Sequence, residues 1–188
     1  MFMNLTHWNY FIAIDNDISV LSRYIEFNEQ NMSAHSIEIA RLLMSSTQEI
    51  DVLLKSICKR HNSPAENEKS YREFIPTIYN NFTSIEVHLP LYNISLAPFG
   101  EWKENKTPSW WTANNKVKHH RDTHFNHASL ENLLLSGAGL YVLNVYYYAK
   151  EMNEPFLIPQ CKNFYSESFG GSLTPTIFGM VSLLKVPD

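Results

Sequence analysis

An uncharged stretch from Asn132 to Ala149 is the feature that most limits how this chain folds. At 18 residues, it is barely long enough to cross a bilayer as a helix. It also contains two asparagines, a serine, two glycines and four tyrosines, a mixture more typical of a helix buried inside a protein. We therefore expect no membrane span. We expect instead a long final helix whose second face is buried in a partner subunit, with Gly137 and Gly139 allowing close approach.

Apolar residues recur at steps of three and four in two earlier segments, which predicts two amphipathic helices. The first is expected over 8–27, and its apolar positions are Trp8, Phe11, Ile14, Ile18, Leu21 and Ile25. The second is expected over 36–60, after Ser36 as N-cap, and its apolar positions are Ile39, Leu43, Ile50, Leu53 and Ile57. A short helix is expected around 70–81, where Pro76 limits its regularity.

The apolar period changes to two near residue 84, which predicts a small β-hairpin over about 84–97. A further helix is expected over 108–121, since Pro108 suits a first helical turn. The segment 153–188 is rich in proline and glycine, which predicts an irregular tail. This tail should pack onto the bundle because it carries many apolar side chains, namely Phe156, Leu157, Ile158, Phe164, Tyr165, Phe169, Ile177, Phe178, Val181, Leu183 and Leu184. The expected fold is one mainly α domain over 1–188, a bundle of about five helices with a hairpin insertion.

Charge and cysteine content exclude several classes of function. A net charge of −4 argues against a protein that coats nucleic acid non-specifically, but it leaves room for a local basic patch. The two cysteines, Cys58 and Cys161, have no metal-ligand spacing and are too few for a disulfide scaffold. Asp15 and Asp17 interrupt the N-terminal stretch where a signal peptide needs an apolar core, so we expect a cytoplasmic protein.

A cluster of histidines and cations is the strongest chemical signal in the sequence. Four of the eight histidines lie between residues 119 and 127, and three cations accompany them, namely Lys116, Lys118 and Arg121. A histidine that titrates near neutrality can take a proton from a ribose 2′-hydroxyl or give one to the leaving 5′-oxygen. An arginine can stabilise the extra negative charge of the phosphorane-like transition state. The cluster therefore suits cleavage of a phosphate ester such as RNA.

The segment Arg121-Asp122-x4-His127 resembles the Arg-x(4–6)-His motif of the HEPN superfamily, in which a polar residue follows the arginine. Two flanking blocks also resemble a group of bacterial HEPN-like proteins. One is Trp111-x3-Asn115-Lys116-Val117-Lys118-His119-x-Arg121 with Phe125-x2-Ala128-x-Leu130-x-Asn132, and the other is Ala40-Arg41-Leu42-Leu43 with Glu49-Ile50-Asp51 and Lys55. The resemblance implies an all-α bundle that dimerises through its motif helices. Many such proteins are metal-independent endoribonucleases of toxin–antitoxin or phage-defence systems, while others only bind nucleotides or partner proteins.

On this resemblance we expect RNA cleavage by Arg121 and His127 without cofactor or metal. The auxiliary or phosphate-binding candidates are Lys118, His119, His124 and Asp122. The expected partners are a second copy of the chain, RNA, and an antitoxin or another defence-system protein. The alternative is a non-catalytic module that binds a nucleotide or a protein.

Three further groups of residues each allow two interpretations. His120, His124 and His127 share one helical face, with Glu131 continuing the row, and on a continuous helix they would offer a metal site; the polar residues at 122–129 favour a break instead. Glu49 borders the apolar stripe of its helix, where it is either a solvated charge or an inward carboxylate paired with Lys118 or Arg121. The tryptophans Trp110 and Trp111 suit either the core or base stacking.

Overall fold

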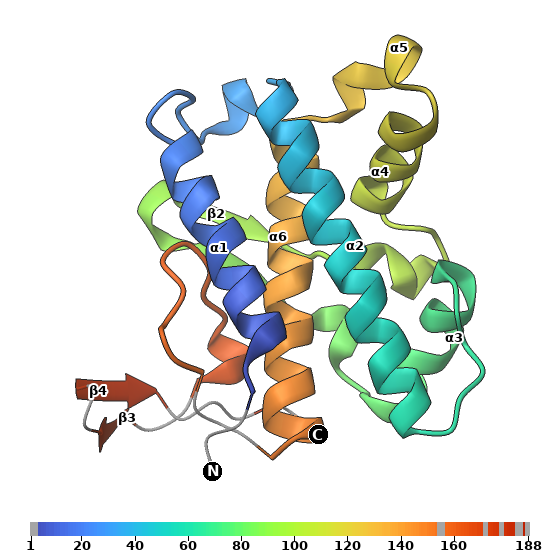
Figure 1. Cartoon of the computed structure of the whole chain (residues 1–188), viewed down its shortest axis with the longest axis vertical. Coiled ribbons are helices and arrows are strands. Elements are labelled where there is room, and N and C mark those ends of the chain that lie inside the picture. The colour runs from blue at the N-terminus through green and yellow to red at the C-terminus, as the bar shows by residue number, and fades with distance from the viewer. Residues whose placement is uncertain (1–3, 154–156, 171–172, 177–178, 183–185, 187–188) are drawn as a thin grey trace.

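The computed structural model describes residues 4–153, 157–170, 173–176, 179–182 and 186 (Figure 1). The described part is mainly helical, as the sequence predicts. Its α-helices are α1 (Thr6–Leu21), α2 (Ile37–Arg60), α3 (Glu68–Ile78), α4 (Ser109–His119), α5 (Arg121–His124) and α6 (Leu130–Val145). A π-helical segment, η6 (Tyr146–Glu151), continues α6. Short 3-10 turns join the helices at η1 (Glu29–Asn31), η2 (Phe82–Ser84), η3 (Pro90–Tyr92), η4 (Gly100–Glu104), η5 (Phe125–His127) and η7 (Glu167–Phe169).

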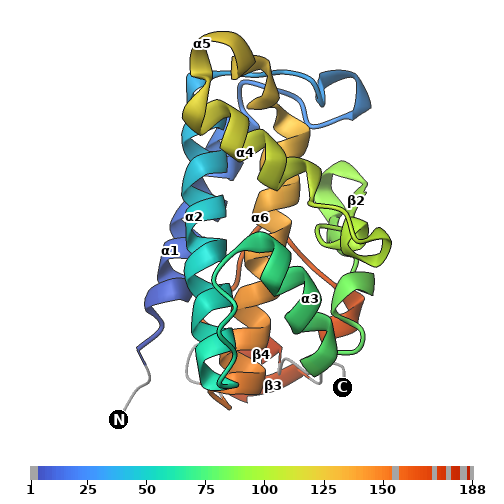
Figure 2. The ribbon, with the colours of Figure 1, turned by 90° about the vertical axis from the view of Figure 1, so that its right-hand side faces the viewer.

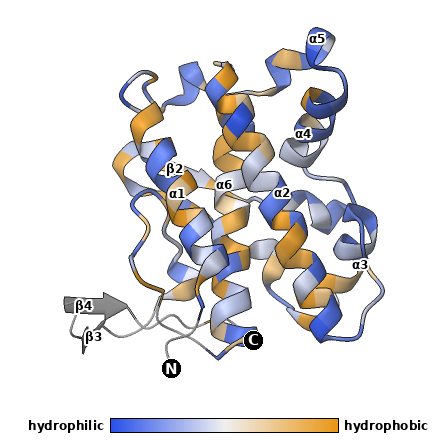
Figure 3. Ribbon diagram, viewed as in Figure 1, coloured by the Kyte–Doolittle hydropathy of each residue, from blue (hydrophilic) through white to orange (hydrophobic). Residues whose placement is uncertain are grey.

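Helix α6 is the centre of the bundle, and α1, α2 and α4 pack around it (Figures 1 and 2). Helix α2 turns its predicted apolar stripe inward, and all five stripe residues are fully buried, namely Ile39, Leu43, Ile50, Leu53 and Ile57. Its N-cap is Ser36, whose hydroxyl accepts a hydrogen bond from the Ile39 amide at 3.1 Å. In Figure 3 the apolar residues follow α1, α2 and α6, whereas α4 and α5 are mostly hydrophilic.

The glycines of α6 make room for aromatic rings of the same chain. A Cβ atom on Gly137 would lie 2.8 Å from Cζ of Phe164, and one on Gly139 would lie 3.4 Å from a ring carbon of Phe99. Every residue from Ser136 to Val145 is buried without any partner subunit. The close approach that we expected of a second subunit is thus made within one chain, and α6 gives no ground for a dimer. Within the described residues, no helix is both long and apolar enough to span a membrane.

Helix α1 ends at Leu21, earlier than the expected residue 27, where the backbone tightens into i→i−3 hydrogen bonds from Arg23 to Val20 and from Tyr24 to Leu21. Side-chain hydrogen bonds then hold the connection that follows. The Asn28 carboxamide accepts from the amide of Asn31, and the Asn31 side chain donates to the carbonyl of Glu26 at 2.9 Å. Helix α3 starts slightly earlier than expected, since Asn67 and Ser70 form a capping box.

The predicted hairpin is present as β1 (Val87–Leu89) and β2 (Ile94–Leu96), which pair antiparallel with Val87 opposite Leu96. The turn between them contains Asn93 in the left-handed region, at φ 53°. Val87, Leu89 and Leu96 are buried and attach the hairpin to the core.

The C-terminal segment packs onto the bundle over residues 157–170, as expected. Leu157, Phe164 and Phe169 are buried. The buried carboxylate of Asp15 accepts hydrogen bonds from the amide of Lys162 at 2.6 Å and from Asn163. Beyond this region the chain forms a second antiparallel hairpin, β3 (Leu173–Thr176) and β4 (Gly179–Ser182), in a tail that we expected to be irregular. Some of the predicted packing residues lie outside the described residues, namely Phe156, Ile177, Phe178, Leu183, Leu184 and the side chain of Val181.

Candidate functional site

The histidine cluster lies on a double turn between α4 and α6, at one end of the bundle (Figure 1). His120 leaves the helical conformation with φ −139°, so α4 stops and the single-turn helix α5 begins at Arg121. The 3-10 turn η5 then leads to Ser129, which caps α6 by accepting from the Asn132 amide at 3.3 Å. The helix break that the polar residues at 122–129 predict is therefore present.

The backbone of His127 is held by the first turn of the core helix. The Asn132 carboxamide donates to the His127 carbonyl at 3.1 Å and to the Ser129 hydroxyl at 3.1 Å. The amide of Leu130 donates to the carbonyl of Ala34 at 2.8 Å, so the α1–α2 connection also supports this turn. Asn132 occurs in the block that resembles HEPN-like proteins, but its positioning role depends on a hydrogen bond that only the folded chain reveals.

The imidazole of His127 is half-buried and faces a cation. Its Nε2 lies 3.4 Å from Nζ of Lys116 on α4. Burial, followed by the charges of Lys116 and His124, lowers the pKa of His127 below its usual value of 6.5. The ring is therefore largely neutral at pH 7. Because an ammonium group only donates, we assign Nε2 as the accepting nitrogen in this contact and place the proton of the neutral ring on Nδ1.

The other three histidines of the cluster form a row of neighbouring rings with His127. The ring of His124 stacks on that of His127 with centroids 5.6 Å apart and an angle of 19°, and His120 lies 5.9 Å from His124. The Nδ1 of His124 is 2.7 Å from the Thr123 hydroxyl. His119 follows at 6.5 Å from His120. Within the described ranges, no three His, Cys, Asp or Glu side chains converge on a point where they could hold a metal ion.

Arg121 is exposed, and its guanidinium is not neutralised by a carboxylate. Its Nη2 lies 3.5 Å from Sδ of Met44 on α2, and no ion pair to Arg121 occurs in the part of the chain that the structure describes. The pairing with Asp122 or Glu131 that an ordinary surface arginine would form is not made. Asp122 is exposed beside it. Lys118 and His119, the last two residues of α4, are also exposed.

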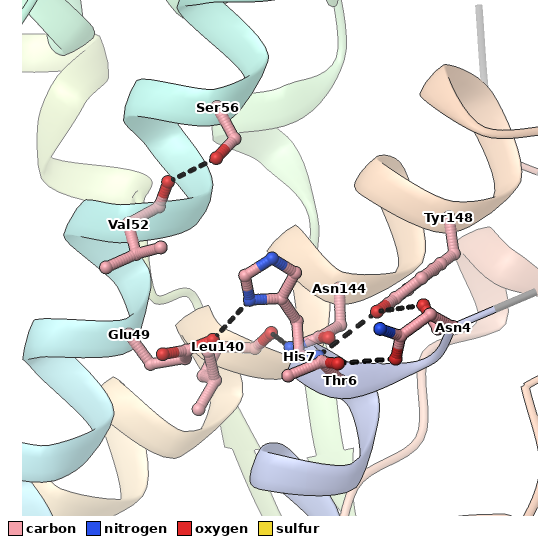
Figure 4. A network of polar contacts seen from close by, with 9 residues as sticks. All are labelled: Asn4, Thr6, His7, Glu49, Val52, Ser56, Leu140, Asn144 and Tyr148. Atoms are coloured by element: carbon pink, nitrogen blue, oxygen red, sulfur yellow. Dashed lines mark hydrogen bonds and ion pairs between the residues drawn. The ribbon is translucent and has the colours of Figure 1, made fainter.

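Glu49 does not belong to this cluster. Its Oε1 lies 2.5 Å from Nδ1 of His7 on α1, and its side chain is 14% exposed (Figure 4). The amide of His7 in turn donates to the Tyr148 hydroxyl at 3.1 Å. The inward orientation that we considered is correct, but the expected charge partner was wrong, because His7 takes the place of Lys118 or Arg121. A partner on another helix, distant in sequence, leaves no local pattern that could reveal it.

The two tryptophans of α4 belong to the core. Trp110 is 0% and Trp111 is 9% exposed. The indole of Trp110 donates to the Pro98 carbonyl at 2.8 Å. Neither ring is therefore free to stack broadly on a base.

Comparison with known proteins identifies no relative. No protein-family model matches the chain, and no curated protein or solved structure shows significant similarity to it.

Proposed function

We propose that this chain is a HEPN-like, metal-independent endoribonuclease whose catalytic residues are Arg121 and His127. One observation carries the proposal. A guanidinium that pairs with no carboxylate of the described residues and an imidazole kept neutral near pH 7 lie on the same short connection between α4 and α6. These are the two groups that RNA cleavage without a metal requires, one to stabilise charge and one to accept a proton.

In the proposed reaction, Nε2 of His127 accepts the proton of the ribose 2′-hydroxyl, and the 2′-oxygen forms a bond to phosphorus. The incoming phosphate draws the Lys116 ammonium away from Nε2, which frees this nitrogen to act as the base. Arg121 donates two hydrogen bonds to the non-bridging oxygens as their negative charge increases. A second histidine in its protonated form, His119, gives its proton to the leaving 5′-oxygen as the bond of that oxygen to phosphorus breaks. The products are a 2′,3′-cyclic phosphate and a 5′-hydroxyl.

The proposal includes a cytoplasmic homodimer in which two copies of the α4–α6 connection face each other and form one composite site, as the resemblance implies. Exposure of Arg121, Asp122 and Lys118 at the end of the bundle is compatible with such an arrangement. An antitoxin or another defence-system protein would control the nuclease by covering this end. Sedimentation at micromolar concentration should show a dimer, and a monomer that cleaves RNA would remove the composite site from the mechanism.

The deciding experiment is to incubate the purified protein with a mixed RNA pool and to map the ends that form. Cleavage should leave 2′,3′-cyclic phosphates, and His127→Ala should be nearly inactive. His124→Ala is the matched control on the neighbouring ring and should retain substantial cleavage. Expression of the unchanged chain should arrest its host, while expression of His127→Ala should not. No cleavage by the purified protein together with harmless expression would refute the nuclease and favour the non-catalytic binding module.

A further inference from the structure

A polar groove runs between α2, the start of α3 and α4, next to the candidate site. Its volume is about 600 Å³, within the range of sites that hold a ligand the size of a nucleotide. Met44 lines the groove and also contacts the Arg121 guanidinium, so the groove opens beside the proposed catalytic arginine. Met44 and Trp111 are the apolar residues that line it.

Four polar side chains line the groove without a polar partner among the described residues. Gln48 of α2 faces Asn114, Asn115 and Lys118 of α4 across it. In the described part of the chain, none of these four side chains has a hydrogen bond or an ion pair. Each carboxamide offers an acceptor and two donors, the combination that reads the edge of a nucleobase. Three such groups and a cation thus line one concavity with their bonding capacity free.

The other charged groups of the groove are already engaged or lie at its far side. Asp51 accepts from the Tyr71 hydroxyl at 3.0 Å and from the Lys55 ammonium at 2.6 Å. Glu68 accepts from the Trp102 indole at 3.0 Å and from Thr107. Glu66 adds a carboxylate on the α3 side, whereas Lys118 and Arg121 lie toward the α4–α5 side. This asymmetry favours a phosphate near α4 and α5 and an uncharged base toward α3.

We propose that this groove binds the base of a nucleotide adjacent to the scissile phosphate in single-stranded RNA, with Gln48, Asn114 and Asn115 reading its edge. Lys118 holds the phosphate that links this nucleotide to the one at Arg121. The inference rests on the proposed function, and it assigns the sequence preference of cleavage to the side chains of this groove. Double-stranded RNA is excluded as the substrate, because a paired base has no free edge to enter the groove.

The test uses the full chain carrying His127→Ala, so that bound RNA is not cut. Fluorescence anisotropy measures its affinity for four labelled hexanucleotides, each made of a single base. One of the four should bind best. Gln48→Ala and Asn115→Ala should weaken that complex about tenfold and reduce the difference between bases, as expected for loss of an edge-on amide contact. Lys118→Ala should weaken all four complexes similarly and reduce their dependence on salt.

Matched controls are Asn80→Ala, an exposed amide outside the groove, and Lys59→Ala, an exposed lysine at the opposite end of α2. Both should leave the four affinities unchanged, and thermal melting should show that every variant is folded. Equal affinities for the four bases, or amide variants that bind like their parent, would overturn the inference even if the unchanged chain cleaves RNA. Base-selective binding by a chain that never cleaves would support the groove and refute the nuclease. Absence of binding at protein concentrations up to about 0.1 mM, the weak limit of non-specific binding to nucleic acid, would overturn the inference. A protein ligand would then be favoured for the groove.

Discussion

The two ends of the bundle use the same kinds of side chain in opposite ways. At the end where α2 and η6 finish, Glu151 is surrounded by partners. It accepts from the Tyr79 hydroxyl at 2.5 Å, lies 3.0 Å from Nε2 of His61, and pairs with Arg60 at 3.5 Å. At the α4–α6 end, Arg121 and Lys118 have no carboxylate partner within the described residues. Satisfied charges hold the chain together, while unsatisfied ones remain available for a ligand.

The direction of the pKa shifts agrees with this contrast. Burial alone would raise the pKa of Glu151, but hydrogen bonds from Tyr79 and His61 and the charge of Arg60 lower it below its usual 4.5. The charged form of Glu151 is therefore part of the fold. Burial and the charges of Lys116 and His124 lower the pKa of His127, so its ring stays neutral beside the Lys116 ammonium. The neutral form of His127 suits proton transfer.

The largest effect is expected at Arg121. Arg121→Lys keeps the charge but loses the two-pronged contact to phosphate, so cleavage should fall about 100-fold or more while RNA affinity changes little. Arg60→Lys makes the same change at the opposite end and should leave cleavage intact. Single-turnover rates on one RNA substrate measure both. Equal losses in the two variants would mean that the ends do not differ in function.

At the other end, the largest effect should be on stability. Glu151→Gln removes the charge that three neighbours compensate, and we expect it to lower the free energy of unfolding by about 2 kcal/mol at pH 7. Because the folded pKa is lowered, this contribution is complete above pH 4.5 and is lost as the pH falls through the folded value. Urea unfolding at pH 7 and pH 3 measures the difference between the proteins. The control Glu73→Gln, on an exposed carboxylate, should change little, and a nuclease defect in Glu151→Gln would contradict the assignment.

A smaller effect is expected from Lys116, which touches His127. Lys116→Gln removes one of the charges that lower the pKa of His127, so that pKa should rise toward its usual value. Cleavage should then begin at higher pH, since the base must be neutral to accept a proton. An NMR titration of the imidazole protons measures the pKa directly, with Lys103→Gln as an exposed control. A pKa that does not move would show that burial alone sets it.

The smallest effect is expected from removing metal ions. Since His127 transfers the proton and Arg121 stabilises the charge, EDTA should alter the cleavage rate by less than about twofold. Loss of cleavage in EDTA and recovery with a divalent ion would instead assign the reaction to metal chemistry, with the histidine row as its first candidate.

Local patterns predicted most of the helices but few of the contacts between them. The stripe of α2 and its cap at Ser36 were predictable because helix period and capping depend on neighbouring residues. The break within 122–129 was predictable from its polar residues, whereas the helix expected over 108–121 already ends at His119. The pairing of Glu49 with His7 and the support of His127 by Asn132 depend on how separate segments pack, so spacing alone could not identify them.

The prediction that a partner subunit covers the second face of α6 failed for the same reason, since the covering residues are distant in sequence. An uncharged helix with two glycines indicates that its surroundings are crowded, but the sequence does not say whether a second subunit or the same chain crowds it. Here Phe164 comes from the C-terminal segment and Phe99 from the turn after the hairpin. Burial was predictable from composition, whereas the origin of the covering residues was not.

The hydrogen bond from Asn132 to the His127 carbonyl has a consequence for how the two catalytic candidates respond to a substrate. His127 is fastened to the buried core helix, so its position is fixed before any ligand arrives. Arg121 begins a separate helix of four residues on the surface, and among the described residues its side chain contacts α2 through the Met44 thioether. When RNA binds, the conformational entropy of the site is therefore lost almost entirely by that one turn. Adaptation to different RNA shapes is confined to α5, while the proton acceptor stays in place.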